Sequence, residues 1–301
     1  MEPKALYNNK YLAIAALGCE MLIEHLQAMS FMKDAPKPGD SWNSGANDFF
    51  DVLKALALRF DGNAFIALYV IAIVLVIIPS VAYFVFATQI HRWNKQQNSP
   101  ATPVIWFFDH IVFGIGFVPI VAHMTEVQFC DVSGDIDSYN NVTCWETGQM
   151  ALIEIGFLVI ALAYFLAGVI FPVLKSERNG IEKRWGNESY FPGIYKLLIL
   201  AVVSLFAPLK LPWPGILATA VVIAYLAFAE CYQELLVASS RMAVLFGQLW
   251  FFICATITDS SESTASYLLI GWIFMAALGF GVLPLKAQII KREPKVLPIE
   301  K

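Results

Sequence analysis

The chain has 301 residues and a formal charge of −4; 58% of its residues are hydrophobic and only 15% are charged. Soluble domains carry about 25% charged residues, so this composition excludes an ordinary soluble protein, and the acidic balance excludes a nucleic-acid partner held by bulk charge. The apolar residues gather in blocks of roughly 18–28, the length that crosses about 30 Å of hydrocarbon as a helix. The sequence predicts an all-α, polytopic transmembrane helical bundle with seven to eight spans, forming one domain over residues 1–301.

The first apolar segment, residues 11–32, leaves the number of spans open. Glu20, Glu24 and Gln27 stand at positions i, i+4 and i+7 of this segment and share one helical face. That face would turn toward the bundle interior in a spanning helix, or toward water in an interfacial one. The two carboxylates also interrupt the apolar core that a cleavable signal peptide needs, so we expect none here.

The rest of the chain alternates apolar runs with short polar connections. The stretch FFDVLKALALRF at residues 49–60 is short and amphipathic, which is typical of a helix along the membrane surface. The predicted spans are about 11–32, 63–90, 103–125, 149–174, 194–211, 215–232, 241–258 and 266–285.

The orientation is predicted from the basic residues near the ends of the spans, because cytoplasmic segments carry an excess of Lys and Arg. With eight spans and a cytoplasmic N-terminus, 15 of the 20 basic residues lie inside and 5 outside. If residues 11–32 do not span, the division is 13 to 7. Both versions place the C-terminus in the cytoplasm and residues 126–148 outside. We expect a plasma or secretory-pathway membrane, with an organellar membrane as the alternative.

The outer loop, residues 126–148, contains two cysteines, the acceptor triplet Asn141-Val142-Thr143, and no Lys or Arg. Oxidising compartments permit disulfides, and N-glycosylation requires lumenal exposure. A Cys130–Cys144 bridge would close a loop of about 15 residues, worth on the order of 3 kcal/mol in the chain-entropy model. We predict this disulfide and a glycan on Asn141; the alternative is a pair of reduced thiols and an unused acceptor.

Ionisable residues within spans are costly in hydrocarbon, so each is a candidate for function. The intramembrane polar candidates are Glu20, Glu24, Asp109, His110, Glu154 and Glu230. One interpretation is a relay of carboxylates and a histidine that moves protons or cations across the bundle. The other is that these groups lie at helix ends and meet interfacial water or a bundle partner.

The sequence shows few signs of catalysis, metal binding or cofactor binding. His110 and His123 have a spacing that suits two haem ligands, but His25 and His91 do not supply the matching pair on a partner helix. The chain has no H-E-x-x-H pair, no G-x-S-x-G nucleophile elbow and no Walker loop. We therefore expect no metal, no cofactor and no enzymatic activity.

The segment from the end of span 103–125 runs through Cys130, a polar loop and the sequence CWETGQ into a long apolar helix. Cys130, Cys144, Trp145 and the following helix to Leu174 resemble the membrane region of Tiny-macrocysts-type proteins of protists. Those are large multi-pass proteins that often carry PAS sensor domains after their spans. The resemblance lies within residues 100–250 and implies a membrane sensing or signalling module, although Gln149 stands where a histidine is expected.

These observations predict a non-enzymatic multi-pass membrane protein of a eukaryotic cell, acting as a sensor or signalling module or as an accessory subunit of a membrane complex. Its expected partners are the lipid bilayer and either other membrane subunits or further copies of itself, with no nucleic acid. Basic inner segments would dock partners or anionic lipid. One alternative is an ion or proton channel or transporter that uses Asp109, Glu154, Glu20 and Glu24. Another is a structural subunit of an organellar membrane complex.

Overall fold

The structure is a computed structural model, and it describes residues 10–31, 44–95, 102–128, 135–136, 139–177, 190–202, 213–228, 235–257 and 264–292. Within these ranges the chain is helical apart from short turns and one two-stranded hairpin. The hairpin pairs Asp135 with Thr143 in antiparallel fashion and belongs to the predicted outer loop. The all-α fold class is confirmed for the part of the chain described.

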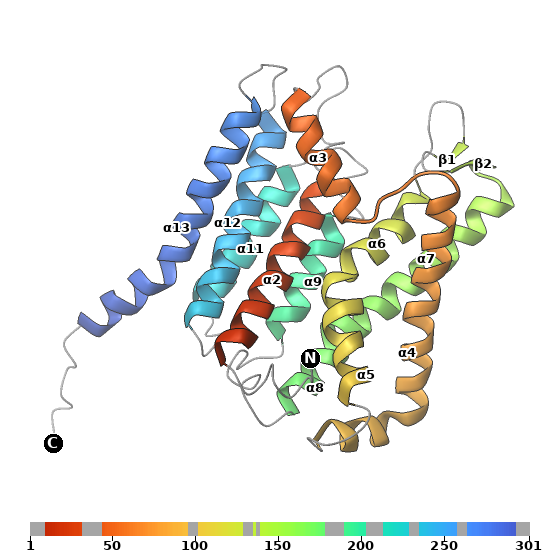
Figure 1. The fold of residues 1–301 in the computed structure, drawn as a ribbon, viewed down its shortest axis with the longest axis horizontal. Helices are drawn as coiled ribbons and strands as arrows, with labels where there is room; N and C mark the ends of the chain where they lie inside the picture. The colour runs from red at the N-terminus through yellow and green to blue at the C-terminus, as the bar shows by residue number, and fades with distance from the viewer. Residues whose placement is uncertain are drawn as a thin grey trace.

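The helices lie side by side and form a bundle, with the hairpin at one end (Figure 1). The first half comprises α2 (Lys10–Met29), α3 (Ser44–Leu56), α4 (Asn63–Lys95), α5 (Thr102–Trp106), the π-helix η2 (Phe107–Ile115), α6 (Phe117–Glu126), β1 (Asp135–Ile136) and β2 (Tyr139–Thr143). The second half comprises α7 (Thr147–Tyr164), the π-helix η3 (Phe165–Ile170), α8 (Phe171–Glu177), α9 (Tyr190–Ala201), α11 (Trp213–Phe228), α12 (Leu235–Ile257) and α13 (Thr264–Arg292).

Four helices of the described chain are long and apolar enough to cross a membrane, and a bent pair raises the number to five. The four are Asn63–Trp93, Thr147–Leu174, Leu235–Ile257 and Tyr267–Lys286. The bent pair joins Pro103–Ile115 to Phe117–Glu126 at 54°. The described chain therefore shows four to five such helices, and the predicted seven to eight spans are not shown by it. Three predicted spans are not among these helices. The described lengths of α9 and α11 are only 12 and 16 residues, and α2 carries the polar face of Glu20, Glu24 and Gln27.

The amphipathic helix α3 lies steeply against the neighbouring helices rather than across their ends (Figure 1). It contacts α2 and α13, and its apolar face buries Phe50 and Leu53. Val52 points the other way and is exposed. The hydrophobic face predicted at residues 49–60 is thus used for packing inside the bundle.

The bend between η2 and α6 occurs at Gly116. The Gly116 amide donates a hydrogen bond to the Ile111 carbonyl oxygen at 2.8 Å, a pairing five residues apart that is typical of π-helix. A Cβ on Gly116 would lie 2.6 Å from the Val112 carbonyl oxygen, so this close turn requires glycine. Such π-bulges kink helices and are frequent at functional sites.

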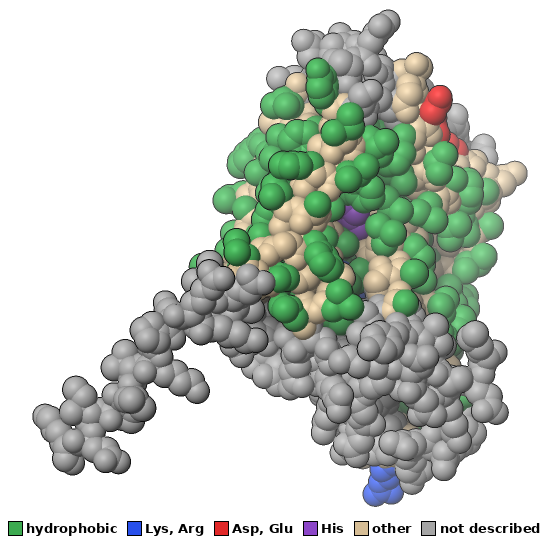
Figure 2. All heavy atoms as spheres, turned by 60° about the vertical axis from the view of Figure 1, so that its left-hand side comes forward, with side chains coloured by type: hydrophobic (Ala, Val, Ile, Leu, Met, Phe, Trp, Pro, Cys, Tyr) green, Lys and Arg blue, Asp and Glu red, His purple; other side chains and the backbone are tan. Residues whose placement is uncertain are grey.

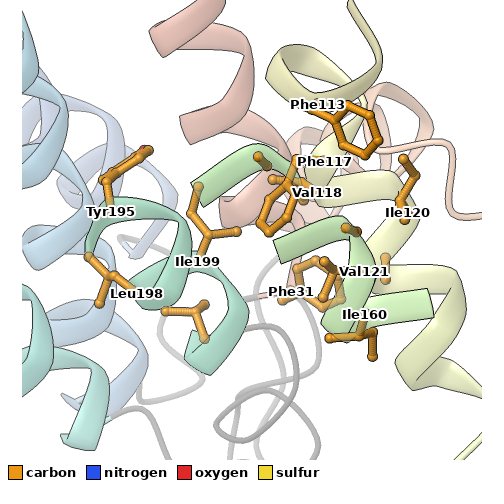
Figure 3. Packing of buried hydrophobic residues seen from close by; sticks show 14 of the residues in the cluster. Phe31, Phe113, Phe117, Val118, Ile120, Val121, Ile160, Tyr195, Leu198 and Ile199 are labelled. Carbon is orange, nitrogen blue, oxygen red and sulfur yellow. The ribbon is translucent and has the colours of Figure 1, made fainter. Parts of the chain in front are cut away.

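The apolar core extends through most of the bundle, and one part of it lies where α9 meets α6 and α7. Figure 3 shows Ile199 of α9 on the side of Phe117 and Val118 of α6, with Tyr195 farther from them, and all four side chains are buried. Helix α7 reaches this core because Gly156 packs directly on the Met124 carbonyl oxygen, where a Cβ would lie at 2.7 Å.

The outer wall of the bundle is apolar. Only 33% of the most apolar stretch of α4 and 17% of that of α13 is buried inside the bundle. A helix that is hydrophobic on its exposed side is typical of a membrane span. Figure 2 shows hydrophobic side chains over most of one face, with acidic groups near one end and basic groups at the other.

Candidate functional site: a buried charge network

Glu24 of α2 is the centre of the site and is only 1% exposed. Lys196 of α9 donates a hydrogen bond to Glu24 Oε1. Arg241 of α12 places its Nη1 atom 3.7 Å from Glu24 Oε2. One carboxylate therefore holds two cations from two other helices, and all three groups are buried.

The two cations also lie over aromatic rings. Lys196 Nζ is 4.7 Å from the centroid of the Phe117 ring, and Arg241 Cζ is 4.1 Å from that of the Tyr195 ring. Lys196 Nζ also donates a hydrogen bond to the Gly114 carbonyl oxygen at 3.3 Å. A ring face attracts a desolvated cation, so these contacts replace part of the hydration that Lys196 and Arg241 lose on burial.

A second group of ionisable residues adjoins the first. His110 Nδ1 lies 2.9 Å from Glu20 Oε2, and His110 Nε2 lies 3.7 Å from Asp109 Oδ2. A Cβ on Gly114 would lie 2.5 Å from Glu20 Oε1, and the carbonyl oxygen of this glycine accepts the hydrogen bond from Lys196. Gly114 thus forms the contact between the two groups.

We call these six residues the buried charge network: Glu20, Glu24, Asp109, His110, Lys196 and Arg241. If the three carboxylates are ionised and His110 is neutral, the two cations bring the formal net charge of the network to −1. Protonation of His110 brings it to zero. Net charge is costly in the membrane interior, and within the network the carboxylates and the cations largely offset one another.

Another ion pair lies at the end of the bundle that is predicted to face outward. Arg59 Nε lies 2.5 Å from Glu126 Oε1, at the end of α6. Arg59 Nη1 donates to the Ser30 carbonyl oxygen at 3.3 Å, and the guanidinium lies 4.1 Å from the centroid of Phe31. Arg59 therefore ties the α3–α4 connection to the outer ends of α2 and α6.

Gln149 joins the two ends of the outer loop. Its Oε1 atom accepts a hydrogen bond from the Trp145 amide at 2.6 Å, and its Nε2 atom donates to the Val127 carbonyl oxygen at 3.0 Å. The side chain is buried. Because its amide both accepts and donates a hydrogen bond, Gln149 has a structural role here. This is the position at which the resemblance to Tiny-macrocysts-type proteins predicts a histidine.

The structure brings together four of the predicted intramembrane residues: Glu20, Glu24, Asp109 and His110. Glu154 is exposed on α7 and takes no part in the network. Glu230 lies outside the described residues, as does Cys130. Cys144 is buried beside Trp145, and Asn141 lies in β2.

Lys196 and Arg241 were not predicted as site residues, because their positions in the sequence suggested helix ends on the inner side. One sequence feature could have identified them: each is a lone cation beside or within a long apolar run, and Glu20 and Glu24 on α2 are carboxylates with which such a cation can pair. Without these two buried cations, the eight-span topology still places 13 basic residues inside and 5 outside.

No protein-family model, curated protein or solved structure matches this chain. The function proposed below therefore rests on the geometry of the described residues.

Proposed function

We propose that this protein is a non-enzymatic multi-pass membrane protein that moves protons or small cations across its membrane through the buried charge network. The observation that carries the proposal is Glu24, sealed between Lys196 and Arg241 at the meeting of α2, α9 and α12. A buried ion pair contributes little net stability relative to apolar packing. Ionisable groups at membrane depth therefore point to ion or proton pathways.

The Glu20–His110 pair is the accessible part of the network. The two side chains are 14% and 13% exposed, whereas that of Glu24 is 2% exposed. A proton taken up by His110 is within hydrogen-bond distance of Glu20 and close to Asp109. The π-helix that carries Asp109 and His110 ends at the bend at Gly116, and such π-turns are frequent at functional sites.

The proposal is tested by proton flux in vesicles that contain the purified protein and an interior pH dye. A potassium gradient with valinomycin sets the membrane potential and drives the protons. We expect flux from the wild type and its loss in Glu20→Gln and His110→Gln. Glu154→Gln is the matched control, since this exposed carboxylate lies outside the network, and it should retain the flux. Absence of flux in the wild type, or equal flux in all four proteins, contradicts the proposal.

A second candidate function, sensor or accessory subunit, is supported by Trp145. This residue has φ 66°, a conformation that is uncommon for a bulky side chain, and it is 81% exposed. The structure thus holds an aromatic side chain outward beside the outer hairpin, and aromatic residues are enriched where partners bind. The resemblance to Tiny-macrocysts-type proteins is in line with this candidate.

A photo-crosslinking amino acid at position 145, placed in the protein in its native membrane, tests the second candidate. Crosslinks to one distinct protein, absent when the same group replaces the exposed Val52, would favour a docking role. Crosslinks to lipid alone would show that Trp145 is an interfacial anchor of the kind that membrane proteins use at the headgroup level.

For the location, we propose a plasma or secretory-pathway membrane of a eukaryotic cell, with the C-terminus in the cytoplasm and the outer loop outside. The excess of basic residues in the inner segments supports this orientation. Epitope tags after Lys301 and within residues 176–186 should be labelled only after the cells are permeabilised. Labelling of either tag in intact cells would reverse the orientation.

A further inference from the structure

A stripe of polar side chains runs along α2 from the buried charge network toward the outer end of the bundle. It contains Glu20, Glu24 and Gln27 of α2 and continues to Ser30, directly after the end of α2; the spacing of four, three and three residues places each about one helical turn from the next. The three beyond Glu20 are buried. Ten residues of helix rise about 15 Å, which is half of the roughly 30 Å hydrocarbon core.

Two atoms of this stripe have no hydrogen-bond partner among the described residues, namely Gln27 Oε1 and Ser30 Oγ. The Gln27 amide is nevertheless held in place, because its Nε2 atom donates to the Leu56 carbonyl oxygen at 3.2 Å. Buried polar atoms in native proteins are almost always paired, and those that lack a protein partner usually bind ordered water.

The spacing of the stripe suits single bridging waters. Neighbouring groups are separated along the helix by about 4.5–6 Å. One water that makes two hydrogen bonds of about 2.8 Å spans a similar distance. A chain of alternating side chains and waters would therefore connect Glu24 to Ser30.

The stripe ends at the Arg59–Glu126 pair. Arg59 Nη1 donates to the backbone oxygen of Ser30, and Glu126, at the end of α6, is paired with Arg59 at 2.5 Å. An unpaired arginine would repel a proton electrostatically. Glu126 neutralises Arg59, so this end of the stripe carries no net charge.

We propose that the polar stripe of α2 is a water-bridged proton route that links the buried charge network to the outer face at Glu126. This inference rests on the proposed function and names the proton as the transported species. Metal cations need several oxygen ligands around one point, whereas Gln27 and Ser30 offer one amide oxygen and one hydroxyl on successive turns. Among the described residues, no group of three or more His, Cys, Asp or Glu side chains could hold a metal ion.

Radiolytic labelling tests for water at the stripe, because hydroxyl radicals formed from bound water oxidise an adjacent thiol. The variant Ser30→Cys places a thiol of similar size on the stripe. Met29→Cys is the matched control, since Met29 is equally buried and, two positions after Gln27, lies on the other side of the helix from that residue. We expect Ser30→Cys to be oxidised several-fold faster, measured peptide by peptide with mass spectrometry. Equal rates at the two positions would overturn the route, whatever the flux assay shows.

Proton flux supplies the second measurement. Gln27→Leu removes the amide oxygen from the stripe and should lower the flux strongly, while Met29→Leu should leave it unchanged. If Gln27→Leu conducts like the wild type, the proton route is wrong even if the stripe holds water. If the wild type carries no flux at all, the proposed function fails, and the oxidation ratio still decides whether the stripe is hydrated.

Discussion

Lys196 on α9 and Glu24 on α2 are 172 positions apart in the sequence and form an ion pair inside the bundle. Arg241 approaches the same carboxylate from α12. The three groups depend on one another unequally, because Glu24 contacts two cations, whereas the loss of one cation leaves the other beside the carboxylate.

This inequality predicts an order of destabilisation. Glu24→Leu leaves two buried cations without their carboxylate and should cost at least the 3–5 kcal/mol that is typical when one partner of a buried pair is removed. Lys196→Met leaves Arg241 beside Glu24 and should lower the free energy of unfolding by less. Denaturant unfolding in detergent measures both variants.

The control for this comparison is Lys54→Met, because Lys54 and Asp61 form an exposed ion pair at 3.3 Å. Exposed pairs are worth about 0–1 kcal/mol. If Glu24→Leu were no more destabilising than Lys54→Met, the interior of the network would be open to bulk water.

The positions of most helices could be predicted from the sequence, because long apolar runs are helical wherever they cross hydrocarbon. The predicted spans 63–90 and 149–174 agree closely with α4 and with the run from α7 to α8. The face shared by Glu20, Glu24 and Gln27 was also predicted, and in the structure it is directed into the bundle. Helical periodicity alone does not distinguish an interior-facing stripe from one that faces water.

The bend at Gly116 and the pairing of the network could not be predicted in the same way. A π-turn depends on the fit of η2 against α2, where Gly114 must admit the Glu20 carboxylate. The partners of Glu24 lie on helices far away in the sequence, and no local pattern identifies which cation meets which carboxylate. Glu20, Glu24, Asp109 and His110 could therefore be identified from the sequence, whereas the two cations, Lys196 and Arg241, could not.

Gly114→Ala should separate the two groups of the network. Its Cβ would lie 2.5 Å from Glu20 Oε1 and would push the carboxylate away from His110. We expect lower proton flux and a lower melting temperature. Gly18→Ala on α2 is the control, because a Cβ there meets no atom within 4 Å and alanine favours the helix by about 0.5–1 kcal/mol. Equal melting temperatures for the two variants would show that Glu20 moves aside at no cost.

Arg59 should be essential to the outer end of the bundle. Arg59→Met leaves the Glu126 carboxylate buried without its cation, and we expect a loss of about 3–5 kcal/mol in the free energy of unfolding. Arg59→Lys should recover only part of this, because an ammonium group cannot reach Glu126 and the Ser30 carbonyl oxygen with the same planar fork. Arg92→Met, at an exposed position of α4, should change the stability little. A lysine variant as stable as the wild type would mean that charge alone holds this end.

The outer loop gives the last prediction: Cys130 and Cys144 form a disulfide, and Asn141 carries an N-glycan. Cys144 is held as a half-cystine, while Cys19 and Cys254 are free; Cys130 is the other cysteine of the outer loop, which both predicted topologies place outside. The hairpin of β1 and β2 and the two hydrogen bonds of Gln149 already restrain this loop. Cys144→Ser should therefore cost less than the 2–5 kcal/mol typical of small secreted domains.

Intact-mass analysis of protein from the native membrane, without reductant, decides both parts of this prediction. A bridge lowers the mass by two hydrogens, and a glycan adds a mass that Asn141→Gln removes. Two free thiols at Cys130 and Cys144, together with an unmodified Asn141, would contradict an oxidising outer side and would favour the organellar alternative. A disulfide without a glycan would keep the loop outside, since Asn141 lies close to the start of α7 in the sequence, where glycosylation is sterically restricted.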